Sequence, residues 1–479
     1  MRWPVPSRRR APIADNQHLG PSLGIGSLTA CGGRSSTTTP PTTARRVDGL
    51  FFPVAGSMGL SARATATPKL IEKIVWAGSN LGSYAMAEEA TRQLAEQEIS
   101  ARRIRHQVNQ VGEARLVERD EAVADLRSMA LPARRRDCVH PEAPQVAVVM
   151  IDGGRYQRRD HFAARGETRP RVSQDRPPTH WRETKVGCLL SMSGKVLQED
   201  PCPAIPAEFA HASVVQEIAR MAANPGSHAS SPPSPEESAS LLATTPADDE
   251  TAVYKPPKLH SRDVVASGQS AEEFGWQVEA RARKLGFPCA QRQAFVADGA
   301  KTNWRIQREH FPDATPIADL MHALSYAWSA SKVDEGEATY RKWAQWIWQG
   351  DVAEVIEHLE ALQSVFGKPP EDSPADPRHH VDRALTYFTN NASHMDYPTY
   401  RKQGLPITSA HIESTVKLIN RRIKGTEKFW GQPTSDTVLQ LRADYLSDSN
   451  PIAGFWRRYH ANQTGSNTYP HAGKQLQSA

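Results

Sequence analysis

Residues Gln145-Val146-Ala147-Val148-Val149-Met150-Ile151-Asp152 form an almost continuous apolar run that ends in an aspartate. Two glycines, Gly153 and Gly154, follow directly. The length of the run, its β-branched residues and the glycine pair predict a buried strand that ends near Asp152. A strand buried on both faces belongs to a sheet covered by helices, so the expected fold class is α/β.

Similar patterns lie downstream of this strand. Residues 185–192 predict a second strand, and Ser193-Gly194 can turn it into a third at residues 195–197, giving a hairpin beside the first strand. Residues 294–297 predict a strand that ends in Asp298-Gly299. A helix at about 304–310 and a strand at about 315–320 come next, and this strand-helix-strand alternation predicts parallel pairing.

Upstream of the sheet, residues 68–129 have a helical pattern. Its last two helices, residues 84–94 and 101–111, are joined by a short turn and give a helix-turn-helix outline. Arg102, Arg103 and Arg105 lie on the second of these helices, which would enter a DNA major groove. A small helical bundle with a solvated basic face is the alternative, because exposed arginines are common on helices.

Composition and pattern together divide the whole chain into segments. Proline- and serine-rich stretches predict disorder at the N-terminal end of the chain and a flexible insertion inside the sheet domain. The expected segments are 1–67, disordered or preceding a true start at Met58; 68–135, DNA-binding helices; 140–223, first part of a catalytic domain; 224–258, flexible insertion; 259–321, second part of that domain; 322–395, helical insertion; 396–450, final catalytic helix region; and 451–479, tail.

Four tryptophans lie in the helical stretch after residue 322: Trp328, Trp343, Trp346 and Trp348. Their spacing within helical repeats predicts core packing, with a stacking surface for nucleic-acid bases as the alternative.

Overall charge and cysteine content limit the class of protein. The net charge is only +5, so a nucleic-acid surface requires local clustering of basic residues. The five cysteines are scattered without a C-x-x-C pair, which favours a reducing cytosol. No stretch is long and apolar enough to span a bilayer, so we expect a cytoplasmic protein without a membrane partner.

Three acidic residues carry the chemical prediction. Asp152 and Asp298 each follow a predicted strand, and Glu413 lies at the head of a basic helix. Carboxylates from separate elements can hold the two divalent cations that assist phosphodiester chemistry. The alternatives are ordinary Asp-Gly turns and a surface ion pair between Glu413 and Lys417.

The helix that carries Glu413 has two distinct stripes. Ile412, Val416, Ile419 and Ile423 form an apolar stripe, while the adjacent stripe is polar and comprises Glu413, Lys417, Asn420 and Lys424. From Asp396 to Trp430, seven Lys or Arg outnumber three acids, which suits phosphate contacts. The expected DNA-binding residues of this region are Lys417, Arg421, Arg422, Lys424 and Lys428.

Seven sequence blocks resemble a known family. They are residues 149–155 (VMIDGGR), 181–185 (WRETK), 298–304 (DGAKTNW), 310–312 (HFP), 319–323 (DLMHA), 404–409 (GLPITS) and 422–430 (RIKGTEKFW). The chain resembles bacterial insertion-sequence DDE transposases, particularly the Kra-type group distantly related to Mutator-like elements, from about residue 70 to residue 450. Many relatives have Gly-Ser-Gly before the glutamate stretch, where this chain has Thr408-Ser409-Ala410.

The resemblance implies an RNase H-like mixed sheet with a helical insertion, and a catalytic triad of Asp152, Asp298 and Glu413 that holds two Mg²⁺ or Mn²⁺ ions. It implies transposition, in which a water cuts the end of the mobile element and the freed 3′-hydroxyl attacks target DNA. The implied partners are terminal inverted repeats, target DNA and further copies of the protein, in the bacterial nucleoid. Two more residues, Asp319 and His322, follow the second acid and have either an accessory or a structural role.

His411 is a further accessory candidate, as a phosphate contact or as a solvated histidine on a basic helix.

Two other functions fit the same residues. A catalytically inactive or co-opted DNA-binding protein derived from a transposase would bind DNA without metal-dependent cleavage. A structure-selective nuclease would cut DNA without joining it to a target.

Overall fold

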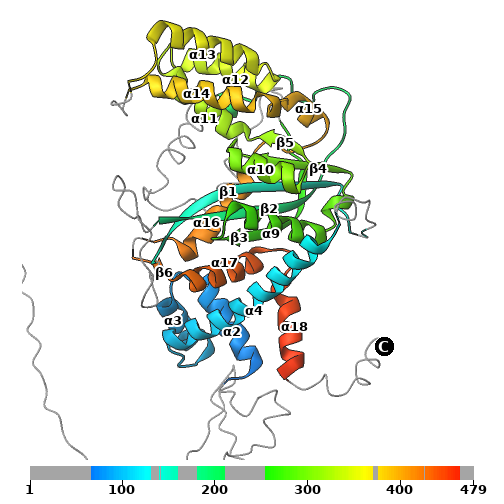
Figure 1. Ribbon diagram of the computed structural model, residues 1–479, viewed down its shortest axis with the longest axis vertical. Coiled ribbons are helices and arrows are strands. Elements are labelled where there is room, and N and C mark those ends of the chain that lie inside the picture. The colour runs from blue at the N-terminus through cyan, green and yellow to red at the C-terminus, as the bar shows by residue number, and fades with distance from the viewer. Residues whose placement is uncertain are drawn as a thin grey trace, which may run out of the picture.

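A mixed sheet forms the centre of the molecule, and helices surround it (Figure 1). The computed structural model describes residues 66–130, 140, 142–159, 181–210, 254–370, 376–425 and 427–463. The strand order is β3-β2-β1-β4-β5, and the short strand β6 pairs with β1. The α/β class expected from the sequence is therefore confirmed.

The parallel part of the sheet contains β1 (Val146–Arg158), β4 (Arg292–Ala297) and β5 (Thr315–Ala318). The predicted parallel pairing around the helix α10 (Lys301–His310) is confirmed. One boundary was wrong, because β1 does not stop at Gly153-Gly154 but continues to Arg158. Antiparallel pairing with β2 runs past the glycines to Gln157, whereas pairing with β4 ends at Ile151.

The antiparallel part of the sheet contains β2 (Trp181–Ser193) and β3 (Lys258–Ser267). The predicted strand at residues 195–197 was wrong, since these residues form no strand. The neighbour of β2 is instead β3, which begins where the sequence predicted the end of a flexible insertion. After β2, residues 207–210 form the short helix α6 (Ala207–Ala210).

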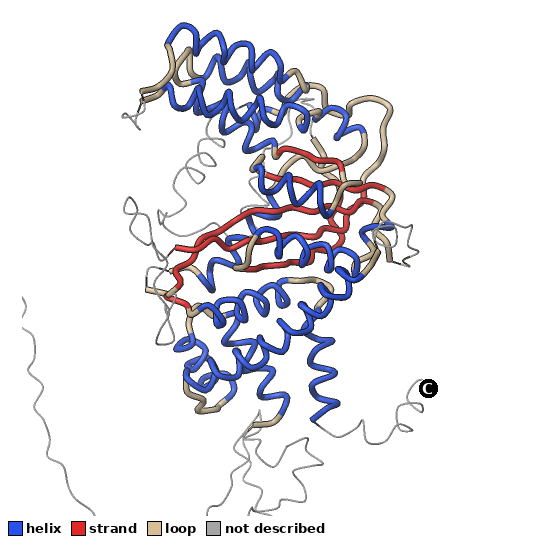
Figure 2. Tube along the Cα trace, in the orientation of Figure 1, coloured by secondary structure: helices blue, strands red, loops and turns tan. Residues whose placement is uncertain are grey.

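Helices cover both faces of the sheet (Figure 2). On one face, Gly187 of β2 lies against Phe274 and Val278 of α9 (Ala271–Lys284), where a Cβ would be 3.3 Å from Val278. On the other face, Gly154 of β1 lies against Asn420 of α16 (Ala410–Ile423). The helix α17 (Gln432–Leu446) follows α16 and lies beside β3.

The stretch between β5 and α16 is helical, as predicted, and projects at the top of Figure 1. It contains α11 (Leu320–Ser331), α12 (Glu337–Gln349), α13 (Val352–Phe366), α14 (Arg378–Asn391) and α15 (Tyr397–Lys402), with the 3-10 turn η2 (Ala392–His394). Trp343 and Trp348 are fully buried and Trp328 is 8% exposed, so core packing is their role.

The N-terminal helices are α2 (Pro68–Asn80), α3 (Tyr84–Ala95) and α4 (Ala101–Ser128). Thr67, Ser83 and Ser100 cap them by accepting backbone N–H groups. Instead of ending near residue 111, α4 continues to Ser128 and packs along α17 and α9. At Gly112 a Cβ would lie 2.5 Å from Thr437, so the glycine allows α4 and α17 to touch.

The remaining elements are the 3-10 turn η1 (Phe287–Cys289), β6 (Phe429–Trp430) and α18 (Pro451–Gln463). In the described part of the chain, no helix has the length and apolar character needed to cross a membrane. Cys188 and Cys202 are buried free thiols, whereas Cys289 is disulfide-bonded, which the scattered cysteine spacing did not predict.

Candidate metal centre and nucleic-acid surface

Three aspartates form one row at the ends of the parallel strands. Ile151 of β1 is in register with Ala297 of β4, and Ala297 with Ala318 of β5. The next residue of each strand is an aspartate, so Asp152, Asp298 and Asp319 lie side by side (the acid row). Residues in register on neighbouring strands point to the same face of a sheet. The acid row therefore points to the face that α16 covers.

The segment before α16 is fastened to this row. The backbone N–H of Leu320 donates to Ile407 O at 3.0 Å, and that of Ser409 donates to Asp319 Oδ1 at 2.8 Å. Glu413 lies on the first turn of α16, and Ser409 Oγ donates to its Oε1 at 3.4 Å. Glu413 therefore faces the acid row, although it is 115 residues from Asp298 in the chain.

Asp319 is fully buried and organises its surroundings. Its Oδ2 accepts the N–H of His322 at 3.1 Å and lies 2.6 Å from His322 Nδ1. Ligand atoms of Asp319, His322 and Glu413 all lie within 4.8 Å of one another, so these residues could hold a metal ion. The sequence placed Asp319 and His322 only as accessory candidates. Asp319 follows a predicted strand, as Asp152 and Asp298 do, and this pattern could have grouped it with them.

Charge and burial shift the pKa values of the cluster. Burial raises the pKa of Asp152 to about 6, and repulsion from Asp298 adds to the effect. Burial, followed by repulsion from Asp319, raises the pKa of Glu413 to about 6. Burial lowers the pKa of His322, but the hydrogen bond to Asp319 and the surrounding carboxylates outweigh it and raise the value to about 9. Asp152 and Glu413 therefore lose their protons only near pH 6, whereas His322 keeps its proton up to about pH 9.

The donor set fits a divalent cation. Asp152 accepts the N–H of Gly153 through Oδ1, and Asp298 accepts Ala300 N and Asn303 Nδ2 through Oδ1. No described residue donates to the Oδ2 atoms of these two aspartates. Carboxylate oxygens with free lone pairs, brought together from separate elements, are the ligands that Mg²⁺ and Mn²⁺ prefer. Asp319, whose oxygens accept three hydrogen bonds, also holds its neighbours in place.

The glycines after the aspartates allow close packing of the strand ends. Gly299 has a φ of +95°, and a Cβ there would lie 2.7 Å from Tyr387 and 2.9 Å from Asn391, both on α14. Gly299 thus allows the tight turn after Asp298 to pack against the helical insertion, and Gly154 does the same for α16.

The stripes predicted for α16 are largely as expected. Ile412, Val416, Ile419 and Ile423 are all buried, while Lys417 and Arg421 are exposed. Lys424 and Lys428 are half-buried at the helix end. Exposed cations therefore follow Glu413 along one side of the helix.

Arg422 was predicted to bind DNA, and this was wrong. Its side chain is 2% exposed, and its Nε donates to Gly78 O of α2 at 2.9 Å. The guanidinium lies between the rings of Tyr84 and Trp430, at 4.6 and 4.8 Å from their centroids. The N-terminal helices α2 and α3 and the strand β6 enclose this cation, so Arg422 joins the N-terminal helices to α16.

Two further predicted contacts lie away from the acid row. His411 is half-buried beside Arg262 of β3, and burial followed by that positive charge lowers its pKa. His411 is not part of the metal cluster. On α4, Arg102 and Arg105 are exposed and Arg103 is half-buried, so the surface required for a groove contact is present.

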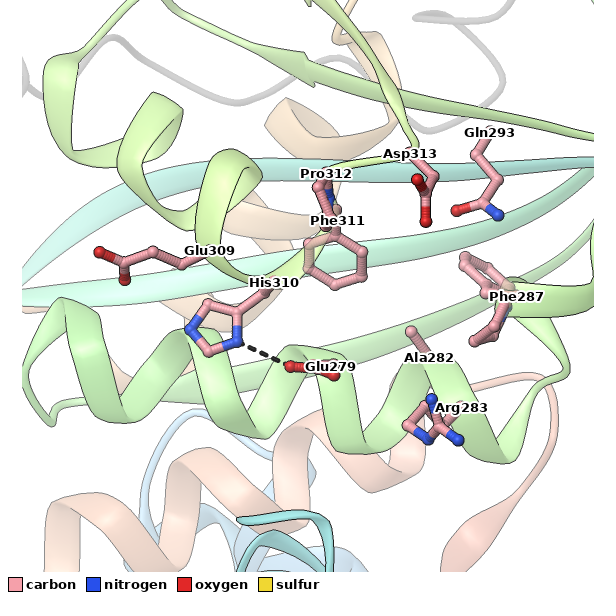
Figure 3. Close-up of a pocket in the computed structure, with 11 residues that line it drawn as sticks. Glu279, Ala282, Arg283, Phe287, Gln293, Glu309, His310, Phe311, Pro312 and Asp313 are labelled. Carbon is pink, nitrogen blue, oxygen red and sulfur yellow. Dashed lines mark hydrogen bonds and ion pairs between the residues drawn. The ribbon is translucent and has the colours of Figure 1, made fainter. Parts of the chain in front are cut away.

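The block His310-Phe311-Pro312 lines a separate small pocket at the end of α10 (Figure 3). His310 Nδ1 lies 2.8 Å from Glu279 Oε2 of α9, and both side chains are buried. The ring of His310 also makes an edge contact with Trp276, with centroids 4.9 Å apart. These contacts fix α10 against α9.

The fold and this site define an α/β protein with a candidate metal centre at the ends of its parallel strands. No protein-family model matches the sequence, and no curated protein matches it.

Proposed function

We propose that the protein is a DDE-type transposase of a bacterial insertion sequence, active in the cytoplasm at the nucleoid. The observation that carries the proposal is that Asp152 and Asp298 end adjacent parallel strands, while Glu413 of the facing helix belongs to the same group of interacting charges through Asp152 and Asp319. An RNase H-like domain also requires a mixed sheet. Here the parallel strands β1 and β4 carry the acids, and β2 and β3 add antiparallel pairing on the other side of β1.

In this proposal, Asp152, Asp298 and Glu413 hold two Mg²⁺ or Mn²⁺ ions, and Asp319 and His322 hold the cluster in shape. Two bound cations activate the attacking oxygen and stabilise the leaving oxygen in phosphodiester chemistry. Lys417 and Arg421 bind phosphates of the DNA strand next to the cluster, because they are exposed on the same helix as Glu413. Terminal inverted repeats and target DNA are the substrates, and two or more copies would pair the element ends.

Product analysis tests this proposal against its two alternatives. Purified protein is incubated with Mg²⁺, a target plasmid and a DNA fragment that carries the sequences flanking its own gene. A transposase nicks the fragment and joins its 3′-ends to the plasmid. Nicked fragments without joined products would instead favour a structure-selective nuclease. Salt-dependent binding without any nicking would favour an inactive DNA-binding protein.

A further inference from the structure

The far ends of β1, β2 and β6 form a three-stranded tip, on the left of Figure 1. Gln157 of β1 is in register with Trp181 of β2 on one side and with Phe429 of β6 on the other. Side chains in register across neighbouring strands project from the same face. Trp181, Gln157 and Phe429 therefore form one row, with the two aromatic residues about 10 Å apart across two strand spacings.

Both aromatic residues of this row are exposed. Trp181 is 40% exposed and Phe429 is 36% exposed. By contrast Trp430, the next residue, points to the opposite face and is 7% exposed against Tyr84 and Arg422. The tip thus buries one aromatic residue and presents its neighbour to solvent. The helix α9 contacts this face of β2 at Gly187, which is six residues after Trp181 in the strand.

The tip is strongly basic. Its described segments 155–159, 181–185 and 427–430 contain six basic residues, Arg155, Arg158, Arg159, Arg182, Lys185 and Lys428, against two acids, Glu183 and Glu427. The guanidinium of Arg159 lies over the ring of Phe429, 4.6 Å from its centroid. Arg155 is exposed and lies diagonally across from Trp181, because its direct partner is Glu183. Aromatic faces flanked by arginines are the combination that binds nucleic-acid bases and phosphates together.

The same strand connects the tip to the acid row. Gln157 lies five positions after Asp152, which is a distance of about 17 Å along a strand, or about five nucleotides. Over that distance β1 has neither β4 nor β6 beside it, since the pairing with β4 ends at Ile151 and that with β6 begins at Gln157. The acid row points towards α16, whereas the exposed aromatic residues point to the other face.

We propose that Trp181 and Phe429, with Arg155 and Arg159, form a stacking platform (the aromatic platform) for unpaired bases of single-stranded DNA. The inference rests on the proposed function, because it places the platform next to a DNA-cleaving centre. It adds that the protein binds frayed or single-stranded DNA beside the cleavage site.

Binding of a labelled random-sequence single-stranded oligonucleotide to the full chain, in EDTA to prevent cleavage, tests the platform. Trp181→Ala and Phe429→Ala should each weaken this binding about tenfold, because stacking of one base contributes about that factor. Trp181→Phe should retain most of the affinity. Blunt duplex of random sequence should be bound by both alanine variants within about twofold of wild type. Trp76→Ala is the matched control, since Trp76 is 51% exposed on α2, outside the platform.

Quenching of tryptophan fluorescence by the oligonucleotide gives a second readout that does not depend on affinity. Saturating oligonucleotide should quench wild type more than Trp181→Phe. Equal quenching, or single-strand affinities of the alanine variants within twofold of wild type, would overturn the platform.

These experiments distinguish failure of the aromatic platform from failure of the proposed function. Asp152→Asn should keep platform-dependent binding, because Asp152 is not part of the platform. If wild type shows platform-dependent binding but no metal-dependent nicking, the proposed function fails and the platform stands. If wild type nicks DNA while Trp181→Ala and Phe429→Ala bind single strands normally, the platform alone fails.

Discussion

At the scale of single residues, the acid row explains why a cation would stabilise this protein. Asp152 and Glu413 both have a pKa raised to about 6, because burial and neighbouring carboxylates disfavour their charged forms. Raised carboxyl pKa values contribute stability below the ordinary value of about 4, and this contribution is lost as the pH rises through 6. A divalent cation binds only the ionised groups. It therefore restores the most stability above pH 6, where both carboxyl groups are ionised.

We therefore predict that Mn²⁺ raises the melting temperature more at pH 8 than at pH 5. Asp152→Asn and Glu413→Gln should each remove most of the increase at pH 8. Thermal unfolding in EDTA and in Mn²⁺, at both pH values, measures the effect. Glu354→Gln, on the exposed side of α13, is the control and should respond as wild type does. A pH-independent increase, or one that both site variants retain, would argue against a cation at these carboxylates.

At the scale of elements, α16 combines two roles in adjacent residues. Arg421 is exposed and faces solvent, whereas Arg422 is buried between Tyr84 and Trp430. A cation enclosed by two aromatic rings contributes about 2 kcal/mol or more. The helix that presents Glu413 is therefore held at its other end by the N-terminal helices.

We predict that Arg422→Ala changes the stability of the protein, whereas Arg421→Ala changes its DNA binding. Arg422→Ala should lower the free energy of unfolding by about 2–4 kcal/mol, because it empties a packed site between three segments. Arg421→Ala should change stability by less than about 0.5 kcal/mol. It should instead reduce the salt dependence of DNA binding by about one phosphate contact. Urea unfolding and binding titrations at several salt concentrations measure both effects, and a stable Arg422→Ala protein with weakened DNA binding would reverse the two roles.

At the scale of the whole molecule, the N-terminal helices and the sheet are packed together. α4 lies along α17 and α9, and Arg115 of α4 donates through Nε to Asp444 of α17 at 2.8 Å. Gly112 lets the two helix backbones approach, since the space for a Cβ is occupied by Thr437. DNA bound by α4 would therefore be read by a unit that is fixed relative to the acid row.

We predict that Gly112→Ala weakens the packing of α4 against α17. In an unobstructed helix this change stabilises by up to about 1 kcal/mol, but here the new Cβ would lie 2.5 Å from the Cβ of Thr437. We expect a net loss of about 2 kcal/mol or more. Gly431→Ala is the matched control, because nothing lies within 4 Å of a Cβ there and its φ is −77°. Chemical unfolding compares them, and equal stabilities would show that α4 and α17 adapt without cost.

Local patterns in the sequence predicted the parallel strands, the α16 stripes and the three acids because each depends on neighbouring residues. The continuation of β1 past Gly153 was not predictable in this way, since it requires the pairing with β2. β3 was missed because its first half, from Lys258 to Asp263, is mostly polar. The burial of Arg422 depends on Tyr84, more than 300 residues away, which no local pattern can indicate.

The most direct test of the metal centre is DNA nicking by wild type and three single variants in Mg²⁺. Asp152→Asn, Asp298→Asn and Glu413→Gln keep the size of each side chain and remove one anionic ligand. We predict that each lowers the nicking rate by at least about a thousandfold while DNA affinity stays within about threefold of wild type. Nicking at the wild-type rate by any one of the three variants would contradict the assignment of these carboxylates as the catalytic centre.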